Sequence, residues 1–248
     1  MQDSEKPILP PLMLTATIQV RTDIRSTPRR DTGIRLNDYK TSLGRWLGNP
    51  AVTSVVFVEN SGFDLSDLEA IARAFPSKHV EFLSFNCPTF NGALQGKSLG
   101  EMLCFEHCLA KSEVLKSASS FLKVTGRYYV PNAQSLMRLL ADRPEIDVVC
   151  NLYRNLTWGD SRVFGATNAF IQDYLLPMRD LIDEEADLGI EQVLARAIHQ
   201  LMAKGGKWSA TPEWLEVQGI SGTLGEAYKV NRFRQGLRHR LLQNILAR

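Results

Sequence analysis

Short apolar segments alternate with amphipathic segments along much of the chain, and this alternation constrains the fold more than any other feature. Each short segment is rich in β-branched and aromatic residues and is bounded by turn residues, which is typical of a strand. The expected strands are Met13–Val20, Ser54–Val58, Val80–Phe85, Phe121–Val124 and Asp147–Leu152.

Between these strands, apolar residues recur three and four positions apart, which indicates helices. We expect helices at Asp38–Leu47, Leu65–Phe75, Ser98–Ala118 and Asn132–Ala141. Asp64 is a candidate N-cap of the second helix, and Ser98 with Glu101 forms a candidate capping box for the third. The order of elements predicts an α/β fold with a mainly parallel sheet flanked by helices.

The pattern changes beyond residue 155. A short strand is expected at Arg162–Gly165, followed by helices at Ala169–Asp183 and Gly189–Ala203 and by a stretch rich in Gly, Trp and Pro. We therefore divide the chain into residues 1–155 and 156–228, as two halves of one domain, and a terminal segment, 229–248.

Charge and cysteine content limit the classes of function. The chain has 29 Lys and Arg against 27 Asp and Glu, a balance that argues against a nucleic-acid binder. Its four scattered cysteines do not suggest a disulfide framework. No apolar segment is long enough to cross a bilayer and no secretory signal is present, so a cytoplasmic protein is expected.

The terminal segment 229–248 holds six Lys or Arg residues and no acid, and its apolar residues repeat with helical spacing. A basic amphipathic helix suits an anionic membrane surface, which predicts a peripheral protein at the inner face of the cytoplasmic membrane. The alternative is a helix that docks its apolar side on the body of the protein or on a second subunit, as in a homodimer.

Ligands of open α/β sheets bind outside the carboxyl ends of the strands, and here those ends are polar. The residues that follow the first, second and fourth strands are Arg21, then Glu59, Asn60 and Ser61, then Thr125, Gly126 and Arg127. In a parallel sheet these residues converge on one edge. The sequence therefore predicts a site there for an anionic, sugar-like ligand.

The segment from Gly96 to Glu101 opens the third expected helix and has two interpretations. Gly96 and Gly100 allow close approach of the backbone, the helix start presents unpaired N–H groups, and Lys97 adds a positive charge. Together these features favour a phosphate site that includes Glu101. The alternative is the capping box. The spacing matches neither a Walker A loop nor a GxGxxG dinucleotide motif.

Five segments carry a resemblance to a known family: FVENSG (57–62), GALQGKSLGE (92–101), FLKVTGRYYV (121–130), DSRVFGA (160–166) and GISGTLGEAY (219–228). They resemble segments of the bacterial GT-A-like glycosyltransferases of lipopolysaccharide O-antigen or capsule assembly. The resemblance implies a Rossmann-like nucleotide-sugar-binding half (1–155) and an acceptor-binding half (156–228). It implies transfer of a sugar from a nucleotide-sugar donor to a glycan or lipid-linked acceptor.

By the same resemblance, Glu59, Asn60 and Ser61 would lie near the base and ribose of the donor; a tight turn into the next helix is the alternative. The chain departs from the GT-A pattern after the fourth strand. Most GT-A enzymes carry a metal-binding Asp-x-Asp motif there, whereas this chain has Thr125-Gly126-Arg127. We therefore expect that no metal or other cofactor is required.

In place of a metal, we expect Arg127 and Lys97 to neutralise the charge on the departing phosphate. A surface ion pair is the alternative for Arg127.

An inverting transfer needs a carboxylate that accepts the proton of the acceptor hydroxyl. By resemblance, Glu191 is the first candidate for this base and Asp160 the second. A first-turn helix glutamate and a turn aspartate are the respective alternatives. Arg162 and Thr223 are expected on the acceptor side. Transfer with retention of configuration is equally open.

Two other functions are open from the sequence. A sugar nucleotidyltransferase would share the α/β nucleotide-binding half, but it favours a loop rich in Gly and Arg after the first strand, and the loop here holds one glycine, Gly33. A non-catalytic, membrane-associated module that binds nucleotides or glycans would keep the polar edge and would need no carboxylate.

Overall fold

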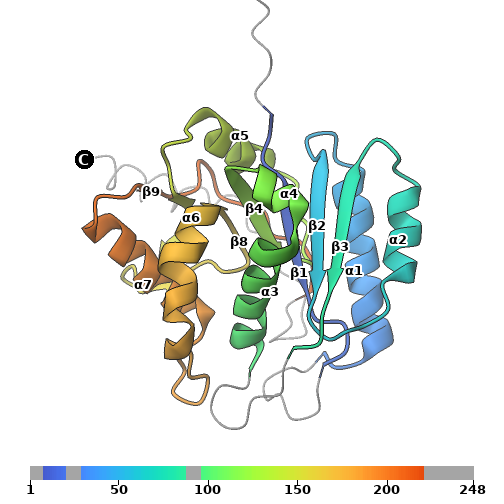
Figure 1. The fold of residues 1–248 in the computed structure, drawn as a ribbon, viewed down its shortest axis with the longest axis horizontal. Coiled ribbons are helices and arrows are strands. Elements are labelled where there is room, and N and C mark those ends of the chain that lie inside the picture. Colours follow the sequence, from blue (N-terminus) through green and yellow to red (C-terminus); the bar gives the residue numbers. More distant parts are fainter. Residues whose placement is uncertain (1–7, 21–28, 88–95, 221–248) are drawn as a thin grey trace, which may run out of the picture.

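The computed structural model describes residues 8–20, 29–87 and 96–220, and within them one seven-stranded sheet organises the chain (Figure 1). Its strands are β1 (Leu12–Ala16), β2 (Ser54–Glu59), β3 (His79–Ser84), β4 (Ser120–Thr125), β5 (Val148–Val149), β8 (Val163–Thr167) and β9 (Trp208–Ser209). They lie in the order β3-β2-β1-β4-β8-β5-β9. A two-stranded hairpin, β6 (Leu152–Tyr153) and β7 (Trp158–Gly159), stands beside it.

The sheet is parallel except for β8, which runs antiparallel to both β4 and β5. The beginning of β8 therefore lies beside the end of β4, where the Thr125 N–H donates to the Arg162 carbonyl at 2.9 Å. This one reversed strand brings residues 160–162 to the edge at which β1, β2 and β4 end.

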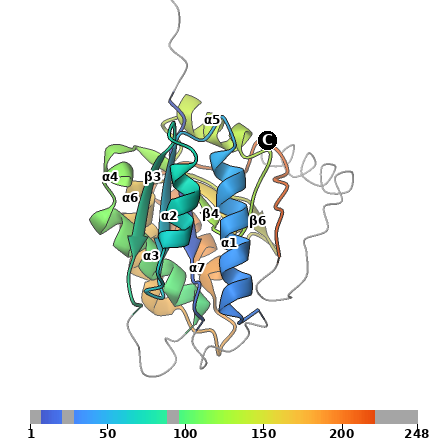
Figure 2. The same cartoon turned by 90° about the vertical axis from the view of Figure 1, so that its right-hand side faces the viewer.

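Helices cover both faces of the sheet. One face carries α1 (Thr32–Leu47), α2 (Ser66–Arg73) and α5 (Gln134–Asp142), and in Figure 2 α1 and α2 lie in front of the strands. The other face carries α3 (Lys97–Lys111), α4 (Glu113–Ser117), α6 (Asn168–Phe170), a π-helical segment η1 (Ile171–Leu175) and α7 (Ile190–Ala203). A 3-10 segment, η2 (Leu176–Leu181), follows η1. These layers confirm the predicted α/β fold.

Side chains alternate between two apolar cores across the sheet. Leu12 and Leu14 of β1 pack into the core under α1, α2 and α5, whereas Met13 packs into the core under α3 and α7. Because both faces are covered, the strands β1, β2 and β4 are almost wholly buried and read in sequence as nearly continuous apolar runs.

The structure differs from several expected element boundaries. The helix expected at Ser98–Ala118 breaks at Ser112, whose hydroxyl accepts from the Leu115 N–H at 3.0 Å and so begins a separate short helix. Asp64 is not the N-cap of α2, because its carboxylate accepts instead from the Ser66 N–H in the turn before the helix. The helix expected at Ala169–Asp183 becomes π-helical and then 3-10 around Pro177.

Three consecutive residues at the tip of the β6–β7 hairpin, Arg154, Asn155 and Leu156, have left-handed backbone angles. Residues other than glycine rarely adopt this conformation.

Among the described residues, no helix is long and apolar enough to span a membrane. The terminal segment 229–248 lies outside the described residues, as do Arg21 and Thr223.

Candidate functional site

The polar side chains at the carboxyl edge of the sheet form two groups. The first, which we call the Glu59 group, consists of Thr17, Glu59, Asn60 and Ser61 in the segments that follow β1 and β2. The second, which we call the Lys123 network, consists of Glu101, Lys123, Thr125, Ser161 and Glu191, contributed by α3, β4, the turn before β8 and α7.

Glu59 is fully buried at the end of β2, and its partners come from the loop that follows it and from the segment after β1. The carboxylate accepts from the backbone N–H groups of Ile18 (2.9 Å), Ser61 (2.9 Å) and Phe63 (3.0 Å), and from the Ser61 hydroxyl. The bonds from Ser61 and Phe63 close the turn that leads from β2 towards α2, as the tight-turn interpretation expects, and the bond from Ile18 ties this turn to the segment after β1.

Asn60 joins this loop to α3. Its side-chain carbonyl accepts from the Thr17 hydroxyl at 2.7 Å, and its amide donates to the Gly100 carbonyl at 3.0 Å. A Cβ at Gly100 would lie 2.8 Å from the Asn60 amide nitrogen, so glycine permits the close contact. Gly100 therefore serves the packing of α3 against the sheet edge.

Lys123 is a charged residue of the site that the sequence analysis did not single out. It lies in the middle of β4 with a side chain that is 0% exposed. Its ammonium donates to the Glu101 carboxylate, to the Thr125 hydroxyl at 3.2 Å and to the Ser161 carbonyl. The one signal in the sequence is a lysine within the apolar run FLKVT, since a buried lysine needs such partners.

Glu101 faces the sheet edge and does not act as a capping residue. The N-cap of α3 is Gly96, with no side-chain capping bond, so the capping-box interpretation of Ser98 and Glu101 is wrong. The Glu101 carboxylate pairs with Lys123 and accepts from the Thr15 hydroxyl at 3.3 Å. Glu101 is thus tied to β1 and β4.

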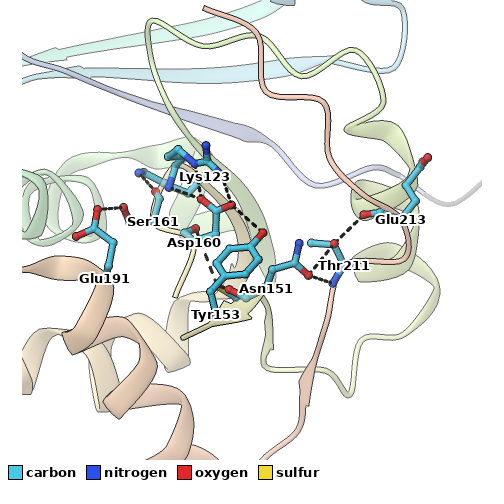
Figure 3. A network of polar contacts seen from close by, with 10 residues as sticks. Lys123, Asn151, Tyr153, Asp160, Ser161, Glu191, Thr211 and Glu213 are labelled. Atoms are coloured by element: carbon cyan, nitrogen blue, oxygen red, sulfur yellow. Dashed lines mark hydrogen bonds and ion pairs between the residues drawn. The ribbon is translucent and has the colours of Figure 1, made fainter. Parts of the chain in front are cut away.

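Glu191, in the first turn of α7, points towards Ser161, whose hydroxyl donates to its carboxylate at 3.0 Å (Figure 3). Burial raises the pKa of the Glu191 carboxyl above its ordinary value, and the neighbouring Glu101 charge adds to the rise. A backbone hydrogen bond at Glu191 itself, the Ser161 hydroxyl and Lys97 oppose this rise. A carboxylate with a raised pKa and one side-chain donor is suited to accept a proton.

Asp160 directly precedes Ser161 of this network, and its carboxylate pairs with Arg162. Its two oxygens accept from the guanidinium Nε and Nη2, both at 2.8 Å, and from the Arg162 backbone N–H at 3.2 Å. The Tyr153 hydroxyl lies 3.5 Å from the same carboxylate (Figure 3), and burial together with the Asp160 charge raises the pKa of Tyr153. Asp160 and Arg162 therefore form an ion pair with two parallel hydrogen bonds at the edge of the sheet.

Arg127 follows β4 and is half-buried. Its guanidinium lies over the Tyr128 ring, 5.0 Å from the centroid, and donates to the Tyr128 hydroxyl at 3.2 Å and to the Ile220 carbonyl at 3.3 Å. No carboxylate is among these partners, so they do not form the surface ion pair that we considered as the alternative. The preceding Gly126 is required by space, because a Cβ there would lie 2.8 Å from the Thr15 carbonyl oxygen.

The start of α3, expected to bind phosphate, already donates to a protein carboxylate. The Ser98 N–H donates to Glu184 at 2.7 Å, and the same carboxylate lies against Gly96. Lys97 is exposed at this helix start. Among the described residues, we find no group of three His, Cys, Asp or Glu side chains arranged to hold a metal ion.

No protein-family profile matches the chain, and no curated protein matches it in sequence. Similar solved structures include a protein described as a nucleotide-diphospho-sugar transferase from Desulfovibrio desulfuricans G20, with 10% identity and a TM-score of 0.48 over 95% of this chain and 94% of that one. The core-mannan synthase A of Aspergillus fumigatus has 9% identity and a TM-score of 0.49 over 95% and 82% of the two chains.

The inositol-1-phosphate CTP transferase of T. maritima has 13% identity and a TM-score of 0.47 over 96% of each chain. The similar structures thus include sugar transferases and nucleotidyltransferases. All three TM-scores are below 0.5, so these similarities assign neither a family nor an activity to this chain.

Proposed function

We propose that the protein is a glycosyltransferase that moves a sugar from a nucleotide-sugar donor to a glycan or lipid-linked acceptor in the assembly of a cell-surface polysaccharide. The observation that carries the proposal is the Lys123 network: a partly buried carboxylate, Glu191, held by Ser161 at the carboxyl edge of a mainly parallel sheet. This edge is where open α/β sheets bind ligands.

In the proposed reaction, the acceptor hydroxyl attacks the anomeric carbon of the donor sugar and gives its proton to the Glu191 carboxylate. A carbon–oxygen bond forms to the acceptor, and the bond between the anomeric carbon and the donor phosphate breaks. The electron pair leaves with the nucleoside phosphate. Attack from the face opposite the leaving group inverts the configuration.

The departing phosphate needs positive charge, and two cations are candidates. Arg127 lies at the end of β4, and Lys97 at the start of α3. We assign Thr125, at the end of β4, to the donor side of the site. We assign Arg162, which pairs with Asp160, to the acceptor side. Neutralising this developing charge is the role that a metal has in many related reactions.

The acceptor class rests on the five sequence segments and on the basic terminal segment. A lipid-linked acceptor lies at a membrane surface, and a basic amphipathic helix would bring the site to it. Removal of residues 229–248 should then reduce sedimentation with vesicles that contain anionic lipid. Equal sedimentation of both proteins would contradict membrane binding and would leave a glycan acceptor in solution.

The first test is a thermal-shift screen against UDP-, GDP-, CMP- and dTDP-linked sugars, with and without Mn²⁺, because a ligand that binds the folded state raises its stability. We expect a shift with one nucleotide, independent of the metal and abolished by Arg127→Ala. Turnover with that donor should survive EDTA. Complete loss of turnover with EDTA, restored by Mg²⁺ or Mn²⁺, would overturn the metal-free mechanism.

The second test is Glu191→Gln, which keeps the shape of the side chain and removes its basicity. We expect turnover at saturating substrates to fall by about 10²–10⁴-fold, the usual contribution of a general base. The matched control is Glu69→Gln, an exposed glutamate in the first turn of α2, which should leave turnover unchanged. A wild-type rate for Glu191→Gln would refute the assignment.

The same preparation distinguishes the alternatives. A sugar nucleotidyltransferase would release pyrophosphate from a nucleoside triphosphate and a sugar phosphate, and would not consume a nucleotide sugar with an acceptor. A non-catalytic module would show donor or glycan binding that Glu191→Gln leaves intact, without turnover of either substrate pair.

A further inference from the structure

The ammonium of Lys123 is the centre of the site's polar structure. It has three N–H donors and three acceptors: the Glu101 carboxylate from α3, the Thr125 hydroxyl from its own strand and the Ser161 carbonyl from the turn before β8. A fully buried ammonium is costly unless it is paired and hydrogen-bonded. Each of its three donors here has a partner within the chain.

Ser161 makes two contacts in opposite directions. Its carbonyl accepts from Lys123, and its hydroxyl donates to Glu191 at 3.0 Å. Fixing the carbonyl restricts the backbone of this residue and therefore the direction of its side chain. Figure 3 shows the resulting chain of contacts, in which Ser161 stands between Lys123 and the Glu191 carboxylate.

We infer that Lys123 is a positioning residue for Glu191: the buried ammonium holds the turn at Ser161, and the Ser161 hydroxyl in turn fixes the direction of the carboxylate. The role of Glu191 as the base rests on the proposed function, but the mechanical link does not. Lys123 itself reaches no substrate, because its three donors are taken up by the protein.

Glu101 neutralises the charge of Lys123 in an ion pair. The Glu101 charge also raises the pKa of Glu191, so positioning is separated from this electrostatic effect by comparing the paired change with and without the Ser161 hydroxyl. The charged groups that bear on Glu191 are Glu101 and Lys97 of α3. Replacing Lys123 and Glu101 together by neutral residues of similar size therefore changes the contact with Ser161 while the summed charge of the pair stays zero.

The test is a four-protein cycle: the wild type, the paired variant Lys123→Met with Glu101→Gln, the variant Ser161→Ala, and all three changes together. The readout is the titration of the Glu191 side-chain carboxyl by 13C NMR, assigned by the resonance that Glu191→Gln removes, and recorded without any substrate. Thermal unfolding of each variant reports whether it is folded.

Loss of the Ser161 hydroxyl removes a donor that favours the ionised carboxylate, so Ser161→Ala should move the titration midpoint to higher pH by about half to one pH unit. The paired variant breaks the same link, but loss of the Glu101 charge also moves the midpoint to lower pH. In the Ser161→Ala background only the charge effect remains, so the move caused by the paired change should be more positive in the wild-type background by about half to one pH unit.

One result would overturn the inference: a move of the Glu191 midpoint that has the same size and sign in both backgrounds, which a direct charge effect would give. If the paired variant does not fold, Ser161→Ala alone decides, since an unchanged midpoint there breaks the chain of contacts. With a working donor and acceptor, the paired variant should lower kcat and leave KM nearly constant.

Failure of the proposed function has a different signature. An intact titration cycle in a protein without transferase activity would keep the positioning of Glu191 and discard the reaction assigned to it. Turnover that depends on Glu191, without coupling between Lys123 and Ser161 in the titration cycle, would support the proposed function and refute the positioning role of Lys123.

Discussion

Glu59 and Glu191 lie at the same edge of the sheet, and the difference between them separates structure from chemistry. Glu59 has four donors, three of them backbone N–H groups, all from the loops that it closes. Glu191 has one side-chain donor, Ser161, on a different element, and a raised pKa. A carboxylate surrounded by three backbone N–H groups and a hydroxyl is part of the scaffold, whereas one with a single side-chain donor retains capacity to take a proton.

The same contrast applies to the two groups around them. The Glu59 group stabilises segments close to one another at the ends of β1 and β2. The Lys123 network joins α3, β4, the turn before β8 and α7. Both groups depend on contacts between residues far apart in the sequence, but most donors to Glu59 are backbone N–H groups, whereas the Lys123 network is built mainly from side chains.

The largest effect on stability is expected for Glu59→Ala. The change leaves one buried and two partly buried backbone N–H groups and a hydroxyl without their acceptor, which should cost about 3–5 kcal/mol of unfolding free energy. Urea unfolding measures the loss. Glu69→Ala, an exposed helix position, is the control and should stay within about 0.5 kcal/mol of the wild type.

A loss below about 1 kcal/mol for Glu59→Ala would show that water replaces the carboxylate without penalty. Glu59 would then be accessible to a ligand, and the distinction between the two carboxylates would no longer hold. The interpretation of Glu59 as a residue near the donor's ribose would regain support.

Much of the scaffold is predictable from the sequence because it depends on local patterns. The apolar runs at β1, β2 and β4 predict buried parallel strands, and the ends of these strands predict where the polar residues meet. The sequence names Glu191 and Asp160 as candidate bases, but it predicts neither their position at this edge nor the difference between their environments.

The direction of β8 and the role of Lys123 were not predictable in this way. Apolar periodicity carries no information about whether a strand runs parallel or antiparallel, so the sequence does not say that residues 160–162 return to the end of β4. For Glu101, a local capping box and a long-range ion pair with Lys123 compete, and a single sequence shows only the local option. The sequence likewise does not show that the Glu184 carboxylate accepts from the Ser98 N–H at the start of α3.

Asp160→Asn sharpens the comparison, because Asp160 neighbours the Lys123 network and yet resembles Glu59 in its contacts. Asparagine keeps one acceptor oxygen but turns an amide towards the Arg162 guanidinium, so we expect a loss of about 1–2 kcal/mol in unfolding free energy. Turnover should fall by less than about tenfold, far less than for Glu191→Gln.

Arg162→Lys is the companion variant, since lysine cannot form the two parallel bonds to Asp160 and should cost a similar amount. A loss of turnover for Asp160→Asn as deep as that for Glu191→Gln, with stability unchanged, would transfer the role of the base to Asp160. The ion pair of Asp160 with Arg162 would then describe only the protein without its substrates.

The smallest expected effect is the pH dependence that Glu191 contributes to the unfolding free energy. The folded-state pKa of Glu191 lies above 4.5, its ordinary value. Between these two values the folded protein binds more protons than the unfolded chain, so the contribution of Glu191 to stability falls as pH rises through this window. Below the window the carboxyl is protonated in both states and the contribution is constant.

Glu191→Gln removes this titration while keeping an acceptor for the Ser161 hydroxyl. The unfolding free energy of the variant relative to the wild type should therefore increase as pH rises from about 4 and level off above the folded-state pKa. Urea unfolding in steps from pH 4 to pH 8 measures the difference, with Glu69→Gln as the flat reference. A difference that stays constant with pH would mean that Glu191 ionises as freely as an exposed glutamate, and the two carboxylates at this edge would then differ only in their number of donors.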